Sequence, residues 1–133
     1  MPAALLGGLL LALATAAPPA LRADEPKEAA AKKKFFLEKV RPLLWENCLR
    51  CHGPEKSENA LRVDSRKALL EGGETGEAVI PGDPEASLLL KAVQYVEQDL
   101  QMPPDRKFSE EEIAAIEKWI KDGAVWAEPE KKP

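Results

Sequence analysis

Three residues that can bind a metal or a cofactor lie within five positions of one another. They are Cys48, Cys51 and His52, which are both cysteines and the one histidine of the 133-residue chain. Thiols at positions i and i+3 face the same side of a helical turn, so each can form a thioether bond with a vinyl group of the same porphyrin. The following histidine then presents its imidazole to the iron. The spacing Cys-x-x-Cys-His therefore predicts one covalent haem c, with His52 as a metal ligand.

Other uses of these three residues fit the sequence less well. A structural zinc site takes four ligands of the Cys/His type, and the chain has three such residues. A thioredoxin-like dithiol would lie in a βαβ context, which the sequence does not show. A disulfide between residues three positions apart would close a very small loop and stabilise little.

A second axial ligand is expected from the only methionine beyond residue 1, Met102. His and Met together are a common ligand pair of cytochrome iron. Pro103 and Pro104 follow Met102 and stiffen its loop, which would hold the thioether at a fixed distance. Methionine also serves as core filler, but a proline-flanked loop is an unusual place for it. His52/Met102 ligation leaves no open position for a substrate, which favours electron transfer over oxygen chemistry.

Four helical segments are expected to position these residues. Their apolar residues recur at helical spacing, and no segment alternates as a strand, so the predicted class is all-α with long loops. The helices are expected at residues 35–48, 66–70, 84–96 and 110–122. The expected core positions are Phe36, Val40, Leu43, Leu44, Leu88, Leu89, Val93, Val96, Ile113, Ile116, Trp119 and Ile120.

Helix boundaries have recognisable signals. Pro42 must kink or restart the first helix because it lacks an N–H group. The expected start signals are Ser65 for the second helix, Asp83 with Pro84 for the third, and a capping box of Ser109 with Glu112 for the fourth. Glycines at 72, 73 and 123 are expected to end the second and fourth helices.

The two ends of the chain differ from the part between them. Residues 1–23 are predicted to be a signal peptide, since residues 3–17 are apolar and uncharged. Cleavage after Ala17 or Ala23 fits, and Ala23 is favoured because the other cut leaves Pro18 first. The segment has no basic residue before its apolar run, and an uncleaved interfacial anchor is the alternative. We expect a linker at 24–33, one domain at 34–126 and a polar tail at 127–133.

Charge limits the classes of partner. Nineteen basic and 23 acidic residues give a net charge of −4, which has the wrong sign for a nucleic-acid binder. Residues 32–56 hold seven basic and three acidic residues, whereas residues 97–117 hold two basic and seven acidic ones. These are either two solvated faces or a dipole that orients docking to a redox partner protein. We expect a monomer that is periplasmic or otherwise exported, with no stable membrane span after cleavage.

The sequence resembles a class I c-type cytochrome, and more specifically the planctomycete-type cytochrome c domain. The resemblance covers about residues 34–126. It rests on residues 40–44 (VRPLL), 51–54 (CHGP), 61–66 (LRVDSR), 80–84 (IPGDP), 102–104 (MPP) and 119–124 (WIKDGA).

The resemblance implies a small cytochrome c-like fold wrapped around one haem, attached through Cys48 and Cys51. It implies an electron carrier, not an enzyme. Trp119 is then expected to pack where the first and last helices meet, near the haem edge. Arg62 suits a haem propionate, although a solvated loop arginine fits equally well. Tyr95 is a weaker candidate for contact with a haem propionate.

Two other functions remain open at this point. A haem enzyme or gas sensor would have a sixth ligand that can be displaced. An interaction module with haem as a structural staple would fit the frequent fusion of such domains to larger proteins.

Overall fold

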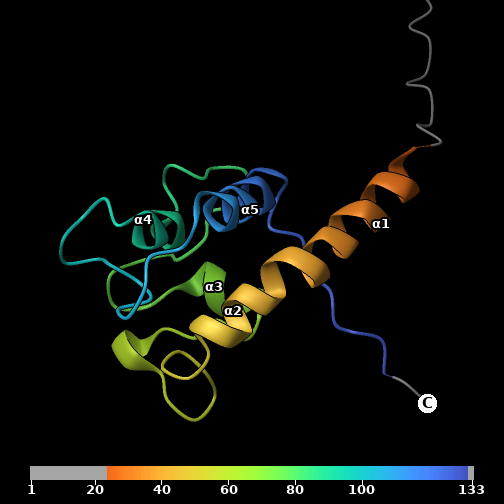
Figure 1. Cartoon of the computed structure of the whole chain (residues 1–133). Helices are drawn as coiled ribbons and strands as arrows, with labels where there is room; N and C mark the ends of the chain where they lie inside the picture. Colours follow the sequence, from red (N-terminus) through yellow and green to blue (C-terminus); the bar gives the residue numbers. More distant parts are fainter. Residues whose placement is uncertain (1–23, 132–133) are drawn as a thin grey trace, which may run out of the picture.

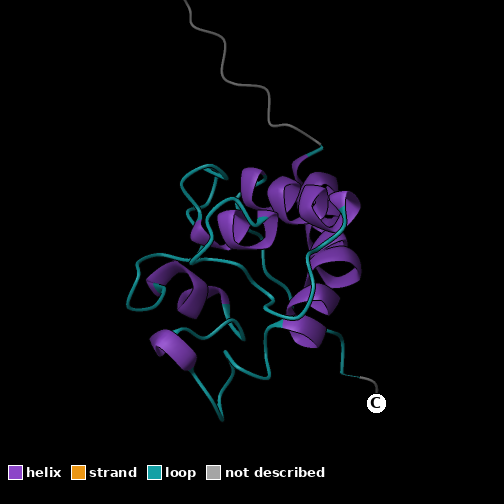
Figure 2. Ribbon diagram, turned by 60° about the vertical axis from the view of Figure 1, so that its left-hand side comes forward, coloured by secondary structure: helices purple, strands orange, loops and turns teal. Residues whose placement is uncertain are grey.

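The computed structural model describes residues 24–131, so the signal peptide expected at 1–23 lies outside the described residues. Within this part of the chain there are helices and no strands, which confirms the all-α class. Long loops connect the helices (Figure 2). The elements are α1 (Glu25–Phe35), η1 (Phe36–Val40), α2 (Arg41–Asn47), η2 (Glu58–Ala60), α3 (Arg66–Glu71), α4 (Leu88–Gln94) and α5 (Glu110–Lys121). No helix among the described residues is long and apolar enough to cross a membrane.

The first three helical elements follow one another as one rod (Figure 1). Pro42 lies in the first turn of α2, so the expected restart of the helix at this proline is confirmed. The turn before it, η1, is a π-helix, in which the Arg41 N–H donates to the Phe36 carbonyl five residues back. The wider turn adapts the helix to a residue that has no N–H to donate.

The core forms where α5 packs against η1 and α4. Phe36 is fully buried, and its ring centroid lies 5.7 Å from that of Trp119 and 4.5 Å from that of Trp126. The apolar face expected for the last helix is buried at Ile116, Trp119 and Ile120. These aromatic contacts fix the rod that leads into Cys48 against the C-terminal helix.

The segment expected to be a linker is helical from Glu25 onward. Its residues 28–32 read Glu-Ala-Ala-Ala-Lys, a strong helix-forming sequence, and Glu28 and Lys32 form an ion pair at 2.7 Å. Pro26 does not interrupt the helix because it lies in the first turn, where its missing N–H has no partner to lose. No residue of α1 is buried, and only Phe35 at its end packs against the core, so most of the helix is stabilised locally.

The third expected helix begins later than predicted, at Leu88 instead of residue 84. The Asp83 carboxylate accepts a hydrogen bond from the Ala86 N–H at 3.1 Å and closes a separate turn. The buried Ser87 hydroxyl accepts from the Ile80 N–H at 2.9 Å and donates to the Asp83 carbonyl at 2.8 Å. These bonds hold the chain in a turn up to Ser87, and the helix starts only after it.

The end of α4 also corrects an expectation. The helix ends at Gln94, and Tyr95 takes a left-handed conformation with φ of 59°. Val96, expected in the core, is 63% exposed, because the chain has already turned away from the helix axis.

The start signals of α3 and α5 are confirmed. The Ser65 hydroxyl accepts from the Ala68 N–H, and Ser109 with Glu112 forms the complete capping box. One contact was not foreseen: the Arg66 guanidinium donates to the Ala124 and Gly123 carbonyls at 2.9 and 3.2 Å. It thereby joins the start of α3 to the end of α5.

Replacing Phe36 by alanine tests the aromatic core. We expect Phe36→Ala to lower the free energy of unfolding by about 3–5 kcal/mol, because a fully buried ring leaves a cavity. Phe35→Ala is the matched control: Phe35 is only half-buried and contacts the Lys118 ammonium at 5.3 Å, so its loss should cost less than half as much. Denaturant unfolding of the haem-loaded protein measures both, and equal losses would contradict this account of the core.

Candidate functional site

The Cys-x-x-Cys-His motif forms the turns that follow α2. The Cys48 N–H donates to the Leu44 carbonyl at 2.9 Å, and the Cys48 carbonyl accepts from Cys51 at 3.2 Å and from His52 at 2.9 Å. The turn brings the three residues together at the C-terminal end of the rod. Both cysteines are free thiols and half-buried.

Two neighbouring cavities border this turn, and Cys48, His52 and Met102 line both of them. The larger of the two, about 300 Å³, has apolar walls from the loops and α4, among them Leu61, Val63, Leu89, Ala92 and Leu100. The other, about 210 Å³, also contains Cys51, Pro103 and Pro104 and has charged residues at its margin. The structure therefore brings four of the sequence-predicted site residues to one place. A third cavity of about 530 Å³, between the rod and α5, contains none of them.

His52 is held from its far side by the segment that follows it. Its Nδ1 lies 3.3 Å from the Leu61 carbonyl oxygen, which can only accept, so the proton belongs on Nδ1. With Nδ1 engaged by this carbonyl, Nε2 is the ring nitrogen that can act as a ligand. The His52 carbonyl accepts from the Val63 N–H at 2.8 Å. The role of the Leu61 carbonyl could not be predicted from the sequence, because every residue has a backbone carbonyl and the residue type does not show which one binds His52.

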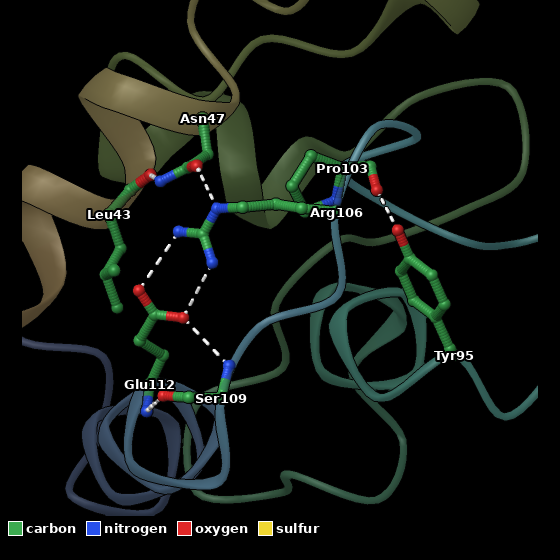
Figure 3. A network of polar contacts seen from close by, with 7 residues as sticks. All are labelled: Leu43, Asn47, Tyr95, Pro103, Arg106, Ser109 and Glu112. Carbon is green, nitrogen blue, oxygen red and sulfur yellow. Dashed lines mark hydrogen bonds and ion pairs between the residues drawn. The ribbon is translucent and has the colours of Figure 1, made fainter.

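Met102 lies on the loop between α4 and α5. Its N–H donates to the Ala92 carbonyl at 3.1 Å. The next residue, Pro103, is buried, and its carbonyl accepts from the Tyr95 hydroxyl (Figure 3). The Met102 side chain is 38% exposed. The loop is thus fastened to α4 and to Tyr95, the residue that follows it, on the two sides of the Met102–Pro103 peptide.

Arg62 and Trp119 line neither of the two cavities around His52. Arg62 donates to both carboxylate oxygens of Asp64, at 2.9 and 2.6 Å. This pairing raises the pKa of Arg62 and lowers the pKa of Asp64. Trp119 is buried against Phe36, and its indole N–H donates to the Val125 carbonyl at 2.7 Å. Tyr95, another candidate, bonds to Pro103 as described.

Sequence reasoning missed the part played by Arg106. Its Nη1 and Nη2 donate to the two carboxylate oxygens of Glu112 at 2.9 and 3.0 Å, and its Nε donates to the Asn47 Oδ1 at 3.2 Å (Figure 3). Arg106 lies four residues after Met102, whereas Asn47 immediately precedes Cys48. A contact between residues 59 positions apart has no local signal in the sequence.

Burial and nearby charges shift the pKa values of Cys48 and Glu112. Burial raises the pKa of the Cys48 thiol to about 12, and the positive charge of Arg106 opposes part of this rise. The thiol is therefore neutral near pH 7. The pKa of Glu112 is lowered, first by the hydrogen bonds from Arg106 and then by the Ser109 N–H, which donates to Glu112 at 2.8 Å.

Comparison with known proteins supports the haem interpretation of the motif. Residues 48–106 match the planctomycete cytochrome C family. The resemblance inferred from the sequence is confirmed. No curated protein and no solved structure was found to match the chain. The matched cytochrome c segment runs from the first cysteine of the motif to Arg106 and indicates a haem c protein.

The residues around the two cavities suit a haem. Two thiols, an imidazole whose Nε2 can bind a metal and a thioether are among the residues that line these cavities. The apolar walls suit a flat hydrophobic macrocycle. The chemistry of this donor set therefore fits covalent haem c.

The Arg106–Glu112 pair predicts a defined acid dependence. Glu112→Gln keeps the capping box but removes the charge. At neutral pH we expect it to lower the free energy of unfolding by about 1 kcal/mol, since the pair is partly exposed. A carboxyl whose pKa is lowered by folding stabilises the protein above its ordinary pKa of about 4.3, and this stabilisation is lost as the pH falls through the lowered value.

The difference between wild type and Glu112→Gln should therefore shrink in acid. Denaturant unfolding of the haem-loaded protein between about pH 7 and pH 3 measures it. Glu111→Gln is the control, because Glu111 lies in the same first turn and is exposed. A constant difference across this range would contradict the assigned charge pairing.

Proposed function

We propose that this protein is an exported mono-haem c-type cytochrome that carries single electrons between redox partners, with His52 and Met102 as axial ligands. The observation that carries the proposal is that Cys48, His52 and Met102 line the same two cavities. The match to the planctomycete cytochrome C family supports the haem. Export rests on the apolar sequence of residues 1–23 and on the usual export of cytochrome c domains.

Each residue has a distinct task in this proposal. Cys48 and Cys51 hold the haem covalently, and Leu61 orients the His52 imidazole through its carbonyl. When bound, the haem supplies the one-electron chemistry. Met102 contributes a neutral, soft sulfur, which raises the reduction potential. The apolar walls of the larger cavity limit water around the site, which also tunes the potential.

Absorption spectra test the proposal most directly. The chain is produced in a periplasm that has haem-attachment machinery, and oxidised and reduced spectra are recorded together with the protein mass. We expect a mass increase for one haem, sharp reduced haem c bands, and the weak far-red band of a Met-ligated oxidised iron. Absence of covalent haem would overturn the proposal. Haem c without the far-red band would overturn the role of Met102.

Met102→Leu separates the axial ligand from the rest of the site. We expect the variant to keep its covalent haem, lose the far-red band and have a lower reduction potential, because the thioether is removed while the cysteines and His52 remain. Gln101→Leu is the matched control, because residue 101 is exposed and adjacent, and it should keep both properties. Spectroscopy and a redox titration measure them. A far-red band in Met102→Leu would identify another ligand.

One observation favours a second function. The Met102 side chain is 38% exposed, so a ligand at this position is accessible to displacement. A gas sensor or haem enzyme would use such a displaceable sixth ligand. Rapid binding of carbon monoxide to the reduced wild-type protein would support this second function, and slow binding would support the electron carrier.

The charge distribution supports an oriented encounter with a redox protein. The segment around the attachment motif, residues 32–56, is basic, and the segment around the Met102 loop, residues 97–117, is acidic. Such a dipole steers association at low ionic strength. We propose that the partner docks through these charges.

Salt should therefore slow electron transfer to the partner. We expect the second-order rate constant to fall as ionic strength rises, because salt screens charges beyond about 10 Å at 0.1 M. Stopped-flow reduction by the partner measures the rate, and reduction by a small uncharged mediator is the control that should not change. A rate that does not depend on salt would contradict the dipole proposal.

A further inference from the structure

The loop that carries Met102 has one contact to α4 and one to Tyr95, the residue that follows α4. The Met102 N–H donates to the Ala92 carbonyl at 3.1 Å, and the Tyr95 hydroxyl donates to the Pro103 carbonyl. Both contacts fix the loop relative to α4. Neither reaches α2, from which the Cys48–His52 turn extends.

Arg106 makes the connection to α2. Its Nε donates to the Asn47 side chain at 3.2 Å, while its two terminal nitrogens hold the Glu112 carboxylate in the first turn of α5. Asn47 is itself oriented, because its Nδ2 donates to the Leu43 carbonyl at 2.9 Å and leaves Oδ1 to accept from Arg106. One guanidinium therefore ties the loop to two helices (Figure 3).

We propose that Arg106 is a positioning residue for Met102: it sets the separation between the Met102 loop and the turn that carries Cys48 and His52. The inference rests on the proposed function, in which Met102 is the sixth ligand. Three donors of one planar group point at two partners, which fixes the position of the loop more tightly than a single contact. A lysine ammonium cannot reproduce this fork.

A purely stabilising ion pair is the competing explanation of the same contacts. The Arg106 side chain is 44% exposed, and exposed pairs contribute little to stability. Such a pair would change the unfolding free energy without changing how firmly Met102 stays in place. The two explanations therefore differ in spectroscopic and ligand-binding measurements.

The experiment uses the haem-loaded protein with Arg106→Gln and Arg106→Lys. Lys107→Gln is the matched control, because it makes the same charge change at the next position, which is exposed. The measurements are the far-red band of the oxidised protein, the rate of carbon monoxide binding to the reduced protein, and denaturant unfolding. We expect both Arg106 variants to show a weaker far-red band and to bind carbon monoxide about tenfold faster, since one charged hydrogen bond contributes about that factor. Lys107→Gln should match the wild type.

The outcomes separate this proposal from the one on which it rests. A wild type without the far-red band overturns both, because Met102 is then not the ligand. The positioning role alone is overturned if the wild type has the band and the Arg106 variants keep both its intensity and the wild-type rate of carbon monoxide binding. This holds even if the variants have a different free energy of unfolding. If Arg106→Gln does not accumulate with haem, Asn47→Ala removes the α2 partner of Arg106 while keeping the Arg106–Glu112 pair, and it should change the same two properties. An unchanged Asn47→Ala would overturn the proposal.

Discussion

His52 and Met102 lie fifty positions apart in the sequence, and the need to bring both to the same cavities constrains the whole fold. The Leu61 carbonyl holds the His52 imidazole, and the Val63 N–H holds the His52 backbone. On the other side, Ala92 and Tyr95 hold the Met102 loop. His52 and the Met102 loop are thus each fixed by backbone atoms or neighbouring side chains. The distance between them therefore depends on how the rest of the domain holds α4 against α2.

The hydrophobic core and the cavity share residues. Val63, Ala78 and Leu89 belong to the buried core and also line the larger cavity. The aromatic part of the core, around Phe36 and Trp119, packs against the middle of the rod, away from the Cys48–His52 turn at its C-terminal end. A domain of this size has a small core. A hydrophobic group that fills the cavity therefore extends the same core, and its binding should be coupled to folding.

Local signals explain which parts of the fold could be predicted from the sequence. The Cys-x-x-Cys-His spacing and the capping residues Ser65 and Ser109 act within three or four residues, and their effects are seen in the structure. The predicted start of α4 at residue 84 is wrong, because the Ser87 hydroxyl accepts a hydrogen bond from the Ile80 N–H across a loop and keeps the chain in a turn up to Ser87. The segment expected to be a linker is helical, which its charge and Pro26 do not signal, because this sequence forms a helix without being buried.

The residues that would hold the haem could be predicted from the sequence, whereas the contacts that position them could not. Cys48, Cys51, His52 and Met102 could be found because each is chemically distinctive and rare in this chain. Arg62 and Arg106 are both loop arginines, and nothing in their immediate sequence tells them apart. Arg62 bonds to a residue two positions away, whereas Arg106 reaches residue 47. Only the position of the Met102 loop beside α2 determines which of the two arginines contacts the helix that leads into Cys48.

Glu112 shows how these supports are coupled. Its carboxylate accepts from the Ser109 N–H as part of the capping box and from Arg106 at the same time. Because one group completes both interactions, the first turn of α5 and the Met102 loop are joined directly. The loop in turn contacts the residue before Cys48 through Arg106. A displacement of the first turn of α5 would therefore move both the Met102 loop and the end of α2. The capping box at this turn thus influences the positions of residues in two other segments.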